Sequence, residues 1–366
     1  MSTTQNFQPR WASPPGETIR DAFEERGLSP VSFANSIGLE LSRLPELLAG
    51  SEPISIDLAR RIVKSIGGSV EFWLTRDGQY RDDLANIEAD SWAKEFPTSQ
   101  MTSWGWIDKA GDWQAQIETY LDFFNVGSLS QWQASYGSLL ETANFRTTDK
   151  VPTNPNAVIA WLRQAERIAE GLPDLPYDPD GFRSALSSVR QLSKTSDPKR
   201  FLPTLESLCA DVGVSVVVLR APRGCPVSGA ARLSADGTPL IALSARYLSD
   251  DHFWFSFFHE AGHVLMHNST SVFIDELERN TARPSSQFEI EADAFATNVL
   301  VPVDVRERLL KERPTPALLH RIAKELEIST GILVGQLQFH GTLLFNSPFN
   351  RLKKRYRWNE ASLEKA

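Results

Sequence analysis

Three histidines and one glutamate lie within a single apolar stretch, FWFSFFHEAGHVLMH, at residues 253–267. His259 and His263 are four residues apart, so on a helix both side chains share one face and can reach the same ion. The order His-Glu-x-x-His is typical of zinc hydrolases, in which two imidazoles hold Zn²⁺ and the glutamate, here Glu260, accepts a proton from water. Because bound zinc lowers the pKa of water to about 7, the pattern predicts hydrolysis near neutral pH.

Chance alone produces motifs with three fixed positions, so the surroundings of this one decide its interpretation. The stretch is apolar on nearly all sides and is therefore expected to form a buried helix, capped at Ser249 or Asp250. Buried imidazoles and a buried carboxylate need partners, and a metal ion would supply them. The next histidine, His267, is interpreted as a structural side chain or a cation at the helix end rather than as a ligand.

A third ligand is expected from the downstream segment QFEIEADAFATNVLVP, residues 287–302. At about 100° per residue, Glu289 and Asp293 fall at the border of the apolar face of this helix, whereas Glu291 points roughly 200° away from Glu289. We therefore predict that Glu289 is the third ligand and that Glu291 is a charge facing solvent. Asp293 is expected to hydrogen-bond the outer nitrogen of a liganding histidine, His259, and so to select its tautomer.

The segments FFHEAGHVLMH and EIEADAFATNVLVP together resemble the ImmA/IrrE family of metallo-endopeptidases. Members of that family typically show a similar His-Glu-x-x-His helix, followed by a Glu-x-x-Ala-Asn/Asp-x-Phe-Ala helix that ends in Leu-x-Pro. The resemblance covers about residues 212–302 and implies a zincin-like domain of the gluzincin type. It places Glu289 at the third-ligand position and Asp293 where many members have asparagine. It also implies a protein substrate, a helix-turn-helix repressor whose cleavage derepresses its operon.

Two runs of β-branched and apolar residues precede the histidine motif and predict strands, VSVVVLR at 214–220 and TPLIAL at 238–243. Between them, Asp236-Gly237 is a typical hairpin turn after the strand-like segment SGAARLS. We expect the strand at 239–243 to lie beside the cleft and to pair with an extended substrate. A donor to the oxyanion is also required, and spacing does not choose among the candidates. These are Arg246, Tyr247 and His252.

The region from residue 16 to residue 80 contains short helix patterns that end at glycines. Its segments PGETIRDAFEERGLS, IGLELSRLPELLAG and GGSVEFWLTRDGQY resemble the helix-turn-helix of the XRE superfamily, specifically the HigA antitoxin type. The resemblance implies a module of five short helices whose third helix enters the major groove of DNA. Ser42 and Arg43 would then be the residues that contact DNA.

Two features of this module weigh against a DNA contact. Pro45 falls where a helix interior would lose a backbone hydrogen bond. Residues 16–80 carry seven Arg and Lys against ten Asp and Glu, a net charge of −3, whereas phosphate contacts favour a positive surface. A degenerate module that serves dimerisation or protein docking, including a homodimer, therefore remains open.

The whole chain of 366 residues carries a formal charge of −8 and two cysteines, which suits a reducing compartment. Its first residues lack the apolar segment of a signal peptide, and no run of eighteen apolar residues occurs, so a cytoplasmic protein without membrane spans is expected. The basic run RLKKRYRW at 351–358 is interpreted as a solvated surface rather than a contact with nucleic acid or an acidic partner.

The predicted fold is mainly α with a small β-sheet, an α+β class. A helix-turn-helix module is expected at residues 1–85, a helical middle region at 86–205 and the zincin-like domain at 206–366. The predicted function is a Zn²⁺-dependent endopeptidase and transcriptional regulator, which cleaves or controls a repressor in a stress-response, mobile-element or toxin-antitoxin system. The alternative is a DNA-binding XRE-family regulator or antitoxin whose zincin domain senses or docks without proteolysis. Glu260, which a binding module does not need, favours the peptidase.

Overall fold

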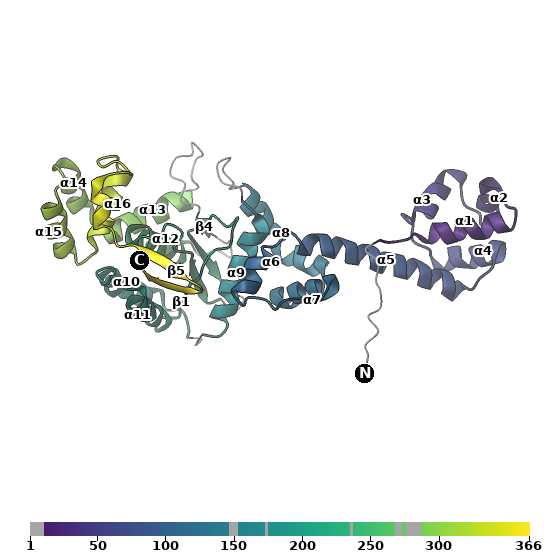
Figure 1. The fold of residues 1–366 in the computed structure, drawn as a ribbon, viewed down its shortest axis with the longest axis horizontal. Helices are drawn as coiled ribbons and strands as arrows, with labels where there is room; N and C mark the ends of the chain where they lie inside the picture. Colours follow the sequence, from purple (N-terminus) through teal and green to yellow (C-terminus); the bar gives the residue numbers. More distant parts are fainter. Residues whose placement is uncertain (1–10, 146–152, 173–174, 235–236, 268–272, 276–286) are drawn as a thin grey trace. The chain divides into compact units, whose positions relative to one another are not determined.

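The computed structural model describes residues 11–145, 153–172, 175–234, 237–267, 273–275 and 287–366. It is mostly helical, with one four-stranded and one two-stranded sheet (Figure 1). The chain divides into two compact units. The first comprises Met1–Glu95 and Ala110–Tyr120, and the second comprises Phe96–Lys109 and Leu121–Ala366. Most of the middle region, 86–205, therefore shares a unit with the zincin-like region. No helix in the described ranges combines the length and apolarity needed to cross a bilayer.

Serine caps and glycine stops define the helices of the first unit. Ser29, Ser55 and Ser69 each accept a hydrogen bond from a backbone N–H in the first turn of the helix that follows, which satisfies a donor without an intrahelical partner. Phe23 stacks on Phe33 at 4.9 Å in the core. The elements are α1 (Pro15–Glu25), α2 (Pro30–Ser36), η1 (Leu41–Arg43), α3 (Leu44–Ala49), α4 (Ile56–Ile66) and α5 (Val70–Ala93).

Two expectations for this unit are wrong. The fifth helix is not short, because α5 runs for 24 residues. No proline or glycine follows Gly78 within it, and ion pairs one turn apart, Arg81 with Asp77 at 2.9 Å among them, support its continuation. Pro45 does not interrupt a helix interior either: Leu41–Arg43 form a separate 3₁₀ turn, and Pro45 lies in the first turn of α3, where its missing N–H costs nothing.

In the middle region, three helices begin with an Asn-Pro or Asp-Pro pair. Asn154, Asp178 and Asp197 accept backbone hydrogen bonds as N-caps, and the proline that follows each has a φ already suited to a helix. Trp161 in the first of these helices donates to the carbonyl of Leu219, which ties the region to the sheet. The helices are α6 (Thr98–Ser103), α7 (Trp113–Phe124), α8 (Leu129–Phe145), α9 (Pro155–Ala169), α10 (Pro179–Leu192) and α11 (Pro198–Ala210).

The four-stranded sheet has the strand order β1-β3-β2-β4. Its strands are β1 (Ser215–Val218), β2 (Gly229–Leu233), β3 (Pro239–Leu243) and β4 (Phe273–Asp275). β3 pairs in parallel with β1 and antiparallel with β2, and β2 pairs antiparallel with β4. The antiparallel β2–β3 pair agrees with the expected hairpin, although Asp236 of its turn lies outside the described residues.

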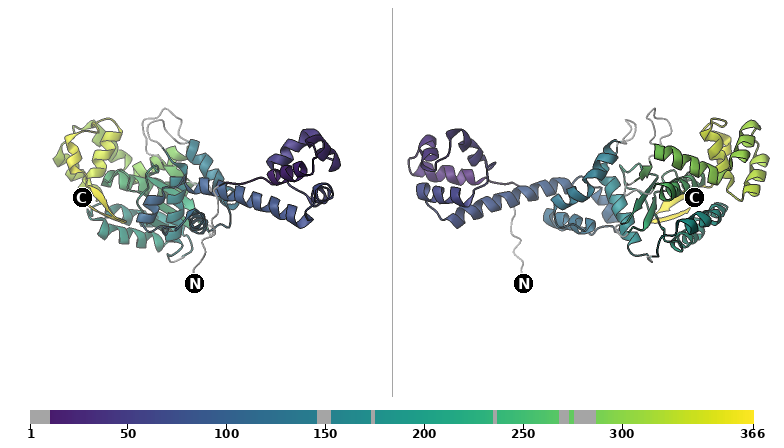
Figure 2. Two further views of the ribbon diagram at one scale, coloured as in Figure 1. Left: turned by 45° about the vertical axis from the view of Figure 1, so that its right-hand side comes forward. Right: turned by 180° about the vertical axis from the view of Figure 1, so that it is seen from behind.

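The position of β3 corrects the prediction for substrate pairing. Both edges of β3 are occupied by other strands, so its backbone cannot pair with a substrate. Every residue of β3 is buried, because helices cover the sheet: α9 and α11 pack on β1, and α12 (Asp250–Met266) packs on β2 and β3 (Figure 2). A continuous apolar run such as PLIAL is thus the pattern of a central strand, not of an exposed one.

The C-terminal part of the chain packs against α12. Lys353 Nζ lies 2.6 Å from Asp251 Oδ2, and both side chains are only 6% exposed. Lys354 donates to the carbonyls of Ser193 and Lys194. The run 351–358 is therefore not simply a solvated surface, because both of its lysines form polar contacts within the second unit. The elements here are α13 (Gln287–Leu300), α14 (Val303–Lys311), α15 (Pro316–Leu326), α16 (Thr330–Phe339), η2 (Pro348–Leu352), β5 (Tyr356–Asn359) and β6 (Ser362–Lys365).

Candidate metal centre

A close crossing of α12 and α13 brings the candidate ligands together. Gly262 lies where these helices meet: a Cβ there would stand 3.3 Å from Cα of Ala292 and 3.1 Å from the Phe295 ring. Larger residues at the crossing would hold the two helices apart. The small pair Gly262 and Ala292 thus places the first turn of α13, with Glu289, against the middle of α12.

Three side chains converge at this crossing. Nε2 of His259 and Nε2 of His263 are 3.0 Å apart. Oε2 of Glu289 lies 3.1 Å from the first nitrogen and 3.6 Å from the second. The two imidazoles are 2% and 1% exposed and the glutamate side chain 19%, so the three donor atoms are largely shielded from water.

This donor set fits a zinc ion. Zinc takes histidine nitrogen and carboxylate oxygen at about 2.0–2.1 Å in a tetrahedron, which separates neighbouring donor atoms by roughly 3.3–3.4 Å. The three separations of 3.0, 3.1 and 3.6 Å lie around that value. Two nitrogens and one oxygen are also the set found in hydrolytic zinc sites that keep one position for water.

Hydrogen bonds on the far side of each imidazole orient both rings. Nδ1 of His259 lies 3.0 Å from Oδ1 of Asp293, and Nδ1 of His263 lies 3.1 Å from Nδ1 of His267. Nε2 of His267 in turn lies 2.9 Å from Oε2 of Glu291. If each Nδ1 of the first two rings carries the proton, both donate outward and both Nε2 lone pairs face Glu289, which is the arrangement a metal requires.

Glu291 is therefore not simply a charge that faces solvent, as its helical angle suggested. Its side chain is 43% exposed, and its Oε2 lies 2.9 Å from Nε2 of His267. His267 ends α12 and extends the hydrogen-bond chain that begins at His263. Helical periodicity places Glu291 on the opposite flank from Glu289, but α13 crosses α12 so closely that both flanks meet α12.

The pKa shifts of Glu289 and His263 favour an ionised carboxylate and a neutral imidazole. Burial alone would raise the pKa of Glu289, but when no metal is bound the two Nε2 atoms can carry protons, and hydrogen bonds from His259 and His263 then hold that pKa well below its usual range. Burial lowers the pKa of His263 more than the Glu289 carboxylate raises it. An ionised carboxylate beside a neutral imidazole has lone pairs ready for a cation.

Glu260 lies next to His259 on α12 and is fully buried. Space for its carboxylate comes from Gly229, the first residue of β2: a Cβ at Gly229 would stand 2.6 Å from Oε1 of Glu260. Gly229 is not among the site residues predicted from the sequence. A glycine within a strand often marks a point where another group approaches the backbone closely. The glycine in the strand-like segment SGAARL could therefore have indicated such a contact at position 229.

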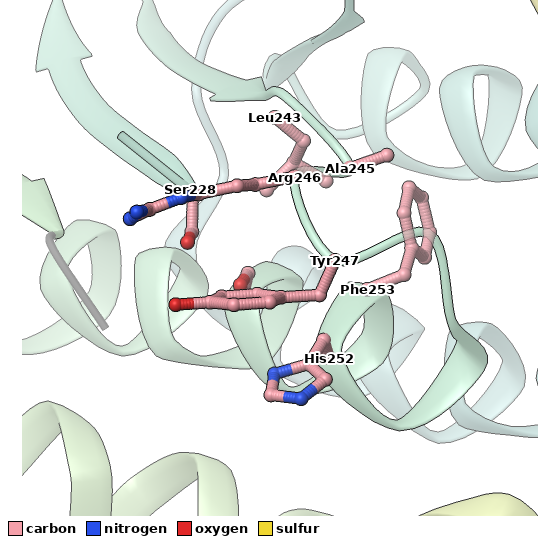
Figure 3. A pocket seen from close by; sticks show the side chains of 8 residues that line it. Ser228, Leu243, Ala245, Arg246, Tyr247, His252 and Phe253 are labelled. Carbon is pink, nitrogen blue, oxygen red and sulfur yellow. The ribbon is translucent and has the colours of Figure 1, made fainter. Parts of the chain in front are cut away.

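The other candidate residues are not members of the metal cluster. Arg246, Tyr247 and His252 gather around a small pocket at the start of α12 (Figure 3). Ser42 and Arg43 belong to the first unit, where Arg43 pairs with Glu52 at 2.5 Å while its side chain remains 52% exposed.

Comparison with known proteins agrees with these observations. Residues 209–337 match the family model of the IrrE N-terminal-like domain of the M78 peptidases. A stretch of 77 residues is 32% identical to virulence-associated protein I of Dichelobacter nodosus and covers 21% of this chain and 69% of that protein. The matched domain contains α12, α13 and all three residues of the candidate metal cluster. Residues 209–337 of this chain are therefore similar to the IrrE-like domain of the M78 peptidases.

Proposed function

We propose that this protein is a zinc-dependent endopeptidase. The observation that carries the proposal is the convergence of His259, His263 and Glu289, with the buried carboxylate of Glu260 on the adjacent position of α12. A binding module would have no use for a carboxylate at that position. A zinc ion held there would supply Lewis acidity toward a water molecule and a peptide carbonyl.

The residues of the chain then have separate tasks. Glu260 takes a proton from the attacking water and passes it to the nitrogen of the departing amine. Asp293 and His267 hold the two imidazoles in the tautomer that leaves Nε2 without a proton. Gly229 keeps the space in which the Glu260 carboxylate lies.

The substrate that we propose is a partner repressor protein in the cytoplasm, so that cleavage relieves repression in a stress-response, mobile-element or toxin-antitoxin system. The support is the resemblance of the zinc-binding segments to ImmA/IrrE peptidases, and that of the first unit to XRE-type helix-turn-helix proteins. Other members of the latter superfamily would be natural partners for such a module.

The N-terminal helices offer a second candidate function, DNA binding through Ser42 and Arg43, in one copy or as a homodimer. The exposure of Arg43 favours it. The ion pair of Arg43 with Glu52 and the net charge of −3 over residues 16–80 weaken it, since phosphates require unpaired positive charge. We therefore assign docking of a protein to this unit ahead of DNA binding.

The decisive experiment compares wild type with Glu260→Gln and with the surface control Glu307→Gln. Each purified protein is loaded with zinc and incubated with repressors encoded beside its gene, and fragments are identified by mass spectrometry. We expect Glu260→Gln to retain one zinc ion and to lose cleavage, while the control cleaves as wild type does. Cleavage by Glu260→Gln at the wild-type rate would remove the assigned base, and absence of zinc from all three proteins would remove the metal site.

A further inference from the structure

A small pocket lies beside the first half of α12 in the second unit. The centre of a water molecule can occupy a volume of about 10 Å³ within this pocket. The pocket therefore has room for about one group the size of an oxygen atom. Figure 3 shows the hydroxyl of Ser228 and the ring of Tyr247 directed into this space. The lining residues are Ser228, Leu243, Ala245, Arg246, Tyr247, His252, Phe253 and Ser256.

Ser228 is the unusual member of this lining. Ser228 is 3% exposed, and its hydroxyl has no hydrogen-bond partner among the described residues. The backbone holds it in place, because the carbonyl of Ser228 accepts from the N–H of Ser244 at 3.0 Å. A buried hydroxyl without a partner is costly and uncommon in folded proteins, so this one calls for a ligand that supplies the missing hydrogen bond.

Part of the lining belongs to a strained turn. Ala245 and Leu248 have φ angles of 50° and 52°, in the left-handed region that side chains other than glycine rarely adopt. Between them, Arg246 donates to the carbonyl of Pro226, and Tyr247 stacks on His252 with ring centroids 4.3 Å apart. Backbone strain of this kind persists where the surroundings require a side chain to be held in one orientation.

The pocket adjoins the residue assigned to proton transfer. Ser256 is one helical turn before Glu260 on α12, about 6 Å along the helix axis. Ser228 directly precedes Gly229, which contacts the Glu260 carboxylate. An extended peptide advances about 3.3 Å per residue, so a peptide reacting at Glu260 would bring the side chain of a residue next to the cleaved bond to this pocket.

We propose that the pocket is a subsite that selects serine beside the cleaved peptide bond. A serine hydroxyl matches the space and supplies the partner that Ser228 lacks. Alanine would leave Ser228 without that hydrogen bond, and longer polar side chains exceed the available volume. The inference rests on the proposed peptidase function, since it names a preference of that site.

Binding selection tests the subsite without requiring cleavage. Full-length Glu260→Gln protein, loaded with zinc, is immobilised and used to select from a random dodecapeptide phage library. We expect serine to be enriched at one fixed position by at least fivefold, and the enrichment to disappear when Ser228→Ala is added. The matched control adds Ser207→Ala, an exposed serine on α11, and should keep the enrichment. Equal enrichment with and without Ser228→Ala, or no serine preference in the parent, would overturn the proposal.

Thermal unfolding provides the second measurement. Because the Ser228 hydroxyl has no partner among the described residues, Ser228→Ala should unfold at the same or a higher temperature than its parent. A lower Tm would mean that the fold itself already satisfies the hydroxyl, and would also count against a ligand. Failure of the zinc-loaded wild type to cleave any selected peptide would remove the peptidase function while leaving the binding preference in place.

Discussion

Gly229 lies directly against the carboxylate of Glu260: a methyl group at Gly229 would stand 2.6 Å from Oε1 and 2.9 Å from Cγ. Both distances are shorter than a normal contact between these atoms. Glu260 is fully buried, so its carboxylate has little freedom to move aside. The first residue of β2 therefore determines where the candidate general base of α12 can lie.

Replacing Gly229 by alanine should displace this carboxylate while leaving the zinc ligands unchanged. A shift of about 1 Å in a reacting group costs on the order of 100-fold in rate, and we expect a loss of that size in peptide cleavage. Metal content, measured by mass spectrometry of the purified protein, should remain at the wild-type level. Gly78→Ala is the control, since a Cβ at Gly78 meets no atom within 4 Å. An active Gly229→Ala protein would show that Glu260 tolerates another position.

Asp293 should be required for tight binding of zinc although it is not placed among the ligands. Its Oδ1 lies 3.0 Å from Nδ1 of His259, so Asp293→Ala removes the acceptor that orients this ring. Loss of such a partner typically lowers metal affinity about 10–100-fold, and competition with a zinc indicator would measure it. Asp304→Ala, at an exposed position of α14, should bind zinc as wild type does. Equal affinities for both variants would leave Asp293 without a role at the site.

Glu289 and Glu291 should differ sharply in their effect on zinc. Glu289→Gln removes a charged donor that lies 3.1 Å from His259 Nε2, and zinc binding should be lost. Glu291→Gln changes only the last member of the chain through His267, so zinc should still bind, with affinity reduced by about tenfold or less. Isothermal titration of both variants distinguishes these outcomes. The reverse order would assign the third ligand to Glu291.

Asp250 should make the stability of the second unit depend on pH. Burial, together with the charge of Asp251, raises the pKa of Asp250 to about 6. Because the folded pKa exceeds the unfolded value, the stabilising contribution is fully present below about pH 4 and is lost as pH rises through 6. Relative to Asp250→Asn, the wild type should therefore lose about 2 kcal/mol of unfolding free energy between pH 4.5 and pH 7.5.

Urea denaturation of both proteins at the two pH values measures this difference. Comparison with the variant cancels the many other groups that titrate over the same range. A difference that does not change with pH, or that grows in favour of wild type as pH rises, would contradict the raised pKa.

Local spacing was enough to predict much of the second unit. The four-residue interval between His259 and His263 places them on one helical face, and the interval from Glu289 to Asp293 does the same on the next helix. The runs at 214–220 and 238–243 contain strands, and the segment 287–302 contains the helix Gln287–Leu300. In each case neighbours within one element carry the information.

Sequence spacing could not predict which elements become neighbours. The central position of β3, the contact of Gly229 with Glu260 and the burial of Lys353 against Asp251 each join segments that are distant in the chain. The donor types, their helical faces and the hydrolytic chemistry that they predict follow from local sequence alone. The close crossing of α12 and α13, at which the three donors meet, depends instead on tertiary packing, because the distance between the helices is set by the volumes packed between them.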